Sequence, residues 1–200
     1  MKRNMENLFK KSAAVLTLVL VIAITSMGQG TWKADPMHSK LTFTITHLGI
    51  SDVQGLFKDF DVTITSSKTD FSDAIFELNA KTASINTEVE KRDAHLKSPD
   101  FFDVEKNPEM TFLSTSLKKA GANKYKLSGN LTLNNITKPV TLDLWYRGTI
   151  ENPMSKTPTA GFQVTGTIKR SDFNFGPKFQ APMLSDEVKI RADGEFLLQK

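Results

Sequence analysis

Charged and titratable side chains gather in one short segment of this 200-residue chain. Arg92, Asp93 and His95 follow closely on one another, and the three-residue spacing of Arg92 and His95 places two side chains on one face of a helix. A guanidinium group binds a carboxylate or phosphate through two parallel hydrogen bonds, and an imidazole can exchange a proton near neutral pH. The segment therefore has the chemistry to pair with an acidic side chain, to bind a head group, or to transfer protons.

Catalysis has the least support among these roles. A serine hydrolase needs a serine activated by a neighbouring base, and the chain has no Gly-x-Ser-x-Gly motif. It also lacks the glycine-rich motifs GxxxxGK and GxGxxG that bind nucleotides. The sequence contains no cysteine, so thiol catalysis, disulfides and a lipid anchor on cysteine are all excluded. We therefore expect a protein that is not an enzyme and has no catalytic residues.

The histidines are the natural candidates for a metal site, and there are only three: His38, His47 and His95. A catalytic zinc site uses three protein ligands and one open position, so all three histidines would have to converge. Their spacings of 9 and 48 residues match no compact ligand motif. We expect no metal, and we interpret His38 and His95 as hydrogen-bonded residues near chain reversals. His47 ends an apolar strand face.

The segment that contains the arginine is predicted to form a short helix. Thr87 and Glu90 have the spacing of a capping box, which predicts a helix start near Thr87. Pro99 disfavours a helical conformation at the residue before it, so the helix should end near Lys97. The two phenylalanines at 101 and 102 then fall on a tight connecting segment.

Apolar and polar residues alternate through most of the remaining sequence, as they do in strands with one buried face. Eight such stretches cover residues 41–47, 60–64, 74–78, 110–114, 125–133, 140–146, 162–168 and 188–198. Eight antiparallel strands can close into a barrel, and closure removes the exposed edges of the sheet. The sequence therefore predicts an all-β fold, an eight-stranded antiparallel barrel with a short helical insert between strands 3 and 4.

A barrel of eight strands either fills with its own side chains or encloses one small ligand. Fourteen phenylalanines and only two tyrosines make the interior poor in hydrogen-bonding groups, which suits a hydrocarbon chain better than a sugar or a nucleotide. At about 0.8 kcal/mol per buried methylene, such a chain needs no specific polar contact. The predicted apolar lining consists of Leu41, Phe43, Ile45, Phe60, Phe76, Phe112, Leu127, Leu131, Leu142, Leu144, Phe162, Val164, Ile168 and Ile190.

Short blocks of sequence along the chain carry a family resemblance. In order they are Asp35-Pro36-x-His38-Ser39, Lys58-Asp59-Phe60, Arg92-Asp93-Ala94-His95-Leu96, Phe101-Phe102-Asp103, Pro108-x-Met110-x-Phe112, Gly129-Asn130-Leu131-Thr132-Leu133, Thr137-Lys138-Pro139-Val140 and Ile168-Lys169-Arg170-Ser171-Asp172-Phe173. Together they resemble the YceI-like family of periplasmic polyisoprenoid-binding proteins. The resemblance implies a lipocalin-like barrel that carries an isoprenoid lipid, either a polyprenyl lipid or an isoprenoid quinone, with no other cofactor.

With the ligand class taken from the resemblance, the polar and charged residues expected near the lipid head group at the barrel mouth follow from their chemistry and position. They are His38, His47, Arg92, Asp93, His95, Arg170 and Asp172. For both arginines an internal ion pair with Asp93 or Asp172 is the simpler alternative. Residues 86–103 are expected to act as a lid over the barrel. Two other functions stay open: an enzyme acting on a small isoprenoid or quinone-like substrate at the mouth, and a structural protein with a filled barrel.

The N-terminal residues have the anatomy of a signal peptide. Four basic residues within the first 11 precede an apolar run at 13–24 and then small residues. We therefore divide the chain into a signal peptide, 1–30, and a lipid-binding barrel, 31–200, that is periplasmic or secreted and keeps no stable membrane anchor after cleavage. Residues 1–30 carry four basic side chains and one acidic one, +3 of the total charge of +4, which leaves +1. That balance argues against nucleic-acid binding. An exposed Trp145 or Phe179 could support a homodimer.

Overall fold

The computed structural model describes residues 30–200, and residues 1–29 lie outside this range. The predicted signal peptide therefore falls almost entirely on residues whose structure is not described, and it stays a prediction. Within residues 30–200, no helix is long and apolar enough to cross a membrane.

The described residues form a single antiparallel sheet and a few short helical segments. The strands are β1 (Gly30–Ala34), β2 (Lys40–His47), β3 (Ser51–Phe57), β4 (Phe60–Ser66), β5 (Ile75–Lys81), β6 (Ile85–Asn86), β7 (Glu109–Gly121), β8 (Lys124–Leu133), β9 (Ile136–Glu151), β10 (Pro158–Lys169) and β11 (Leu184–Leu198). The helical segments are α1 (Glu90–Lys97) and the 3-10 turns η1 (Thr82–Ser84) and η2 (Arg170–Phe173).

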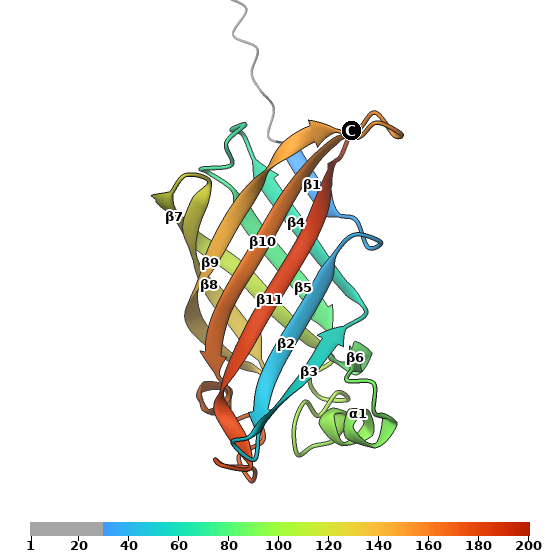
Figure 1. Ribbon diagram of the computed structural model, residues 1–200, viewed down its shortest axis with the longest axis vertical. Coiled ribbons are helices and arrows are strands. Elements are labelled where there is room, and N and C mark those ends of the chain that lie inside the picture. The colour runs from blue at the N-terminus through green and yellow to red at the C-terminus, as the bar shows by residue number, and fades with distance from the viewer. Residues whose placement is uncertain (1–29) are drawn as a thin grey trace, which may run out of the picture.

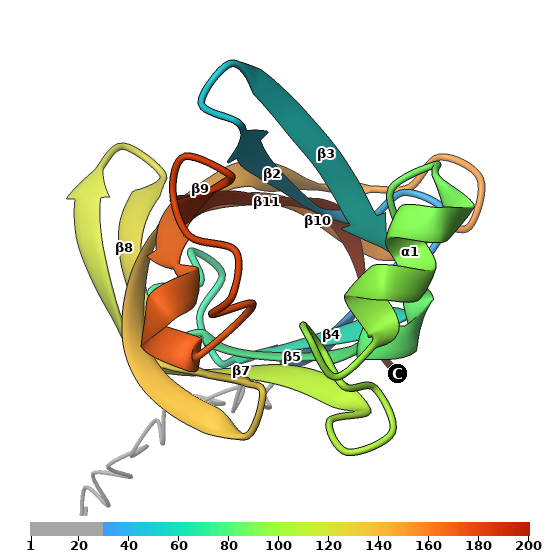
Figure 2. The same cartoon turned by 90° about the horizontal axis from the view of Figure 1, so that it is seen from below.

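The sheet closes into a barrel (Figure 1). Its strand order is β1-β4-β5-β7-β8-β9-β10-β11, and the pairing of β1 with β11 completes a ring of eight. The first part of β11 pairs with β2 instead of β1, and the sheet continues from there through β3 to β6. Figure 2 shows α1 at the rim of one end of the barrel, beside β3. The predicted eight-stranded barrel with a helical insert before β7 is confirmed.

Three strands escaped the sequence prediction, namely β1, β3 and β6. β1 and β6 are only five and two residues long, too short for alternation to stand out. In β3 the inward face includes Gly55, which pairs with Phe43 of β2 and lies under its ring. β3 pairs with β6 only at Leu56 and Phe57, so among the described residues Ser51–Gly55 has one free edge.

The helix ends where the sequence predicted but begins three residues later. Its first residue is Glu90, and its N-cap, Val89, makes no side-chain capping bond. The capping-box prediction was therefore wrong. Thr87 is buried, and its hydroxyl donates a hydrogen bond to Asp93 instead of accepting one from a backbone N–H of the first helical turn. In a capping box the carboxylate of Glu90 would accept from the Thr87 backbone N–H. Here Asp93, one helical turn inside α1, accepts from it instead.

Aromatic side chains fill one end of the barrel. Phe162 lies at the centre of this cluster, with the rings of Phe71, Phe76, Tyr146 and Phe196 at centroid distances of 5.0–5.6 Å. The loop between β4 and β5 folds inward to bury Phe71, which is only 2% exposed. Edge-to-face and tilted packing at these distances is favourable for aromatic pairs. This end of the barrel is therefore closed by protein, and the cavity described below lies at the other end.

Close packing between β7 and β8 depends on Gly129. A methyl group there would lie 2.5 Å from the carbonyl oxygen of Leu113 and closer still to the ring of Phe112. Gly129→Ala should lower the free energy of unfolding by about 1–3 kcal/mol, because the strands must shift to admit it. At Gly161 a methyl group would meet only the Cβ of Arg147, at 3.4 Å, so Gly161→Ala is the matched control, with an expected change within about 0.5 kcal/mol. Urea unfolding measures both, and equal effects would contradict this account.

Candidate ligand-binding cavity

A cavity of about 360 Å³ occupies the end of the barrel next to α1. Its walls come from β2 and β3, from α1 and the segment that follows it, and from the far ends of β10 and β11 with the loop between them. Most lining side chains are aliphatic or aromatic. The exceptions are two threonines, two histidines and two arginines: Thr42, Thr87, His47, His95, Arg92 and Arg170.

Only part of the predicted apolar lining surrounds this cavity. Five of the fourteen residues do: Leu41, Phe43, Ile45, Ile168 and Ile190. The other nine belong to the packed core of the barrel instead: Phe60, Phe76, Phe112, Leu127, Leu131, Leu142, Leu144, Phe162 and Val164. They point inward as the alternation predicted. The alternation could not reveal that other core side chains, among them the aromatic cluster around Phe162, pack against these nine residues and occupy the space there.

Part of the remaining apolar wall comes from irregular segments that the strand pattern did not single out. Phe101 and Phe102 follow α1, and Phe175, Phe179 and Met183 lie in the loop before β11. The Phe102 and Phe175 rings pack edge-to-face at 4.5 Å. The one available signal was the density of phenylalanines in these two loops, where solvent-exposed connections would be polar.

The predicted head-group residues separate into two sets. His47, Arg92, His95 and Arg170 line the cavity. The other three, Asp93, His38 and Asp172, do not. Asp93 is buried beneath Thr87, and Asp172 is exposed on η2.

Arg92, Thr87 and Asp93 form a connected polar group in the cavity wall. Arg92 donates from Nε to the Thr87 hydroxyl and from Nη2 to the Thr87 carbonyl oxygen, both at 2.8 Å. The Thr87 hydroxyl donates in turn to Asp93, at 2.5 Å, and the Thr87 backbone N–H donates to the same carboxylate oxygen at 2.8 Å. No ion pair joins Arg92 to a carboxylate of residues 30–200 within 4.0 Å. The cavity wall therefore carries a positive charge with unused N–H donors.

Arg170 differs from Arg92 because its hydrogen-bonding capacity is used up. It is buried, and its Nε and both Nη atoms donate to five backbone carbonyl oxygens, those of Phe175, Gly176, Phe179, Leu184 and Ser185. A guanidinium group has five N–H donors, so none remains for a ligand. The predicted ion pair with Asp172 is absent from the described residues. Burial lowers the pKa of Arg170, and the nearby charge of Asp186 opposes that effect.

Contacts between two loops cross the cavity mouth. The rings of Phe101 and Phe179 stack at 4.9 Å, and His95 packs edge-on against both. Lys178 donates to Asp100 at 2.7 Å, and His95 Nε2 lies 3.2 Å from the other oxygen of the same carboxylate. These hydrogen bonds, that from Lys178 first, lower the pKa of Asp100. Phe179 is therefore partly covered by contacts within the chain, and the homodimer stays a prediction.

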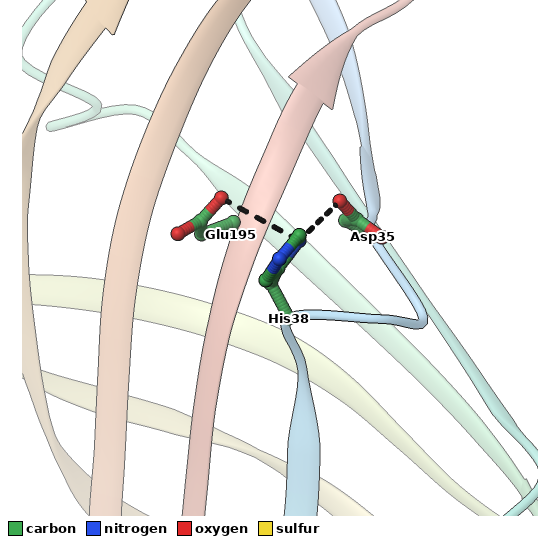
Figure 3. Close-up of side chains that lie close together, drawn as sticks. All are labelled: Asp35, His38 and Glu195. Carbon is green, nitrogen blue, oxygen red and sulfur yellow. Dashed lines mark hydrogen bonds and ion pairs between the residues drawn. The ribbon is translucent and has the colours of Figure 1, made fainter. Parts of the chain in front are cut away.

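His38 belongs to a separate group on the outside of the barrel (Figure 3). Its Nδ1 lies 2.8 Å from Asp35 and 3.9 Å from Glu195 of β11, and the three possible ligand atoms lie within 4.8 Å of one another. The group could hold a cation through one nitrogen and two carboxylates. Its observed bonding is a clasp that ties the β1–β2 turn to β11, as the backbone bond from Asp35 N–H to the Glu195 carbonyl also does.

An eight-stranded barrel that is packed at one end and encloses an apolar cavity at the other is the architecture of lipocalin-type proteins, whose interior has room for one small ligand. The YceI-like domain matches residues 32–196, so the chain belongs to the YceI-like family.

Individual relatives agree with this assignment. A UPF0312 protein of Photorhabdus laumondii is 39% identical over 180 residues, which cover 86% of this chain and 93% of the relative. The crystal structure of the YceI protein of Campylobacter jejuni is 32% identical, covers 78% of this chain and 90% of its own, and superposes with a TM-score of 0.68. A polyisoprenoid-binding domain from Saccharophagus degradans shares the fold, with 13% identity, a TM-score of 0.67 and coverage of 86% and 99%.

The buried guanidinium of Arg170 makes a stability prediction. Arg170→Lys keeps the charge but offers three donors to five carbonyl oxygens, and each buried carbonyl left without a partner costs about 1–3 kcal/mol. We expect the variant to lose about 2–5 kcal/mol of unfolding free energy in urea. Arg147→Lys, at an arginine that is about half exposed on the barrel surface, should change it by less than about 0.5 kcal/mol. A small loss in Arg170→Lys would show that the loop does not depend on this arginine.

The His38 clasp makes a pH prediction. Its hydrogen bond with Asp35, and then the charges of Asp35 and Glu195, raise the pKa of His38 above 6.5, and the same hydrogen bond lowers the pKa of Asp35 below 3.8. The His38 contribution is complete below pH 6.5 and is lost as pH rises through the raised pKa. The Asp35 contribution is present above pH 3.8 and is lost as pH falls through the lowered pKa. The stability difference between wild type and His38→Gln should therefore be largest between these two values, and a difference that is constant with pH would refute the clasp.

Proposed function

We propose that this protein is a periplasmic carrier that holds one isoprenoid lipid, a polyprenyl lipid or an isoprenoid quinone, with the tail in the cavity and the head near Arg92. The observation that carries the proposal is an apolar cavity of about 360 Å³ whose wall contains Arg92, which has no carboxylate partner among the described residues and keeps N–H donors that are not used within the chain. The resemblance to a domain described as polyisoprenoid-binding supports the ligand class. Family membership supports it as well.

The walls suit a branched hydrocarbon. The cavity volume lies within the range of about 300–1,000 Å³ that small-ligand sites occupy, and such sites combine apolar walls with a few polar groups that set orientation. Each methylene that leaves water contributes about 0.8 kcal/mol, so the tail supplies most of the affinity. Arg92 uses two of its five N–H donors on Thr87, and the others can bind a phosphate or a quinone oxygen.

Binding without chemistry fits the polar groups in the wall. Thr42 donates its hydroxyl to a β11 carbonyl oxygen, which is not a base that would activate it. The Thr87 hydroxyl donates to the buried carboxylate of Asp93 and accepts from Arg92 Nε, so this hydroxyl is engaged in the structure of the wall on both sides. His95 is held by Asp100. These arrangements support a binding protein over an enzyme. Turnover of an isoprenoid substrate that depended on His95 would favour the enzyme instead.

Export is part of the proposal and rests on the N-terminal sequence. The basic start, the apolar run at 13–24 and the small residues after it support cleavage near residue 30 and delivery to the periplasm. The mass of the protein recovered from that compartment would show the cleavage directly.

Native mass spectrometry of the exported protein, followed by extraction and identification of the released molecule, tests the carrier function. We expect one isoprenoid lipid or quinone per chain. Ile45→Trp should reduce the occupied fraction, because the larger ring fills part of the cavity. Ile150→Trp, at an exposed position on β9, is the matched control and should stay occupied. A wild-type protein that remains empty after incubation with both lipid classes would refute the proposal.

A substitution of Arg92 tests whether the bound head group is charged. A hydrogen bond to a charged group contributes about 1.5–3 kcal/mol, so Arg92→Gln should weaken binding of a polyprenyl phosphate by about tenfold or more. Binding of a neutral quinone should change much less. Lys91→Gln, at the exposed neighbouring position of α1, controls for the loss of charge. Equal loss of both ligands in the Arg92 variant, measured by fluorescence titration, would show that Arg92 shapes the wall instead of reading the head group.

A further inference from the structure

Two segments that are far apart in sequence form an uncharged tip beside the cavity mouth. One is the β2–β3 turn, residues 48–50, and the other is residues 181–183, just before β11. The Leu48 N–H donates to the Met183 carbonyl oxygen at 3.0 Å, and a methyl group on Gly49 would lie 4.0 Å from Pro182. Neither segment contains a charged residue. We call residues 48–50 and 181–183 the apolar tip.

The apolar tip exposes large side chains to solvent. Ile50 is 86% exposed, Leu48 50% and Met183 47%. Single exposed apolar side chains are ordinary on protein surfaces, but three on two segments in contact form a patch. Covering such a patch is favourable, because it removes apolar surface from water.

The apolar tip is continuous with the cavity. Met183 belongs both to the tip and to the cavity lining, and the neighbours of the tip, His47 and Leu184, line the cavity as well. Figure 1 shows the β2–β3 turn and the segment that leads into β11 together at the end of the barrel where the cavity lies. A hydrocarbon chain that leaves the cavity past Met183 therefore meets further apolar surface.

We propose that the apolar tip docks on the surface of a lipid bilayer, from which the cavity takes its ligand and to which it returns it. This inference rests on the proposed carrier function. The size of the patch favours a bilayer over a protein partner, because stable protein interfaces need about 800 Å² and 20–30 residues on each side. Interfacial insertion needs only a few apolar side chains that reach the acyl boundary. Because the tip has no charge, docking should not require anionic lipid.

Flotation and lipid transfer with phosphatidylcholine vesicles test the inference. The wild-type protein should float with these vesicles and load a fluorescent isoprenoid quinone from them. The double variant Leu48→Ser/Ile50→Ser should load at least tenfold more slowly and float less. The matched control is Ile150→Ser/Met154→Ser, which removes two exposed apolar side chains from β9 and the turn after it, outside the tip and the cavity lining. Its loading rate should equal that of wild type.

Loading from a detergent-dispersed quinone separates the two proposals. The tip variant should reach the same final occupancy as wild type from detergent, because its cavity is intact. If wild type loads from neither source, the carrier function fails. If wild type loads from vesicles and the tip variant does so at the same rate, docking through the tip is refuted. A concentration-dependent dimer that Ile50→Ser abolishes would also refute it, since a second copy would then cover the tip.

Discussion

The guanidinium group of Arg170 donates all of its N–H hydrogen bonds to backbone carbonyl oxygens of residues 175–185. Burying a charged group is costly unless each polar atom finds a partner, and the carbonyls of an irregular loop have the same need. Each therefore satisfies the other. The loop thus held places Phe175, Phe179 and Met183 in the cavity wall, and it also presents half of the apolar tip. Wall, mouth and tip all depend on this one buried charge.

The interior of the barrel is mainly apolar, yet its two ends differ. The aromatic cluster around Phe162 closes one end by filling it, and Phe71 enters from a loop to complete the packing. At the other end the two loops contribute aromatic rings to the perimeter, and the space inside remains open. A ligand can thus occupy one end while the other supplies the stability of the ring. In the proposed carrier, the tail is recognised by shape and burial, and the few polar groups of the wall are assigned to the head group.

Regular alternation made most of the fold predictable. Each long barrel strand has one inward face of apolar residues, and a period of two identifies it without any tertiary information. The same signal could not separate Ile168 from Phe162, which share a face of β10 but lie beside the cavity and in the core respectively. That distinction depends on which rings fill the space opposite. The loop residues Phe101 and Phe179 lie outside any periodic pattern. The bonding of Arg170 depends on how the loop that follows it folds back, which periodicity does not report. The Thr87 prediction failed for a similar reason: the threonine is buried next to Asp93, and its hydroxyl donates to that carboxylate instead of capping the helix.

Because β3 has a free edge, the β2–β3 hairpin can open locally while the closed ring of the barrel stays folded. Ser51–Gly55 is paired on one side only, to β2, whereas each strand in the closed ring has neighbours on both sides. Local opening of a protein follows its weakest cooperative unit, and the β2–β3 hairpin can detach from β11 while the β1–β11 pairing still closes the ring. Amide protons of this hairpin will consequently exchange with solvent at a lower free energy than those of β8 to β10. Part of the cavity wall, the residues from β2 and β3, thus belongs to a section of the sheet that can open without global unfolding.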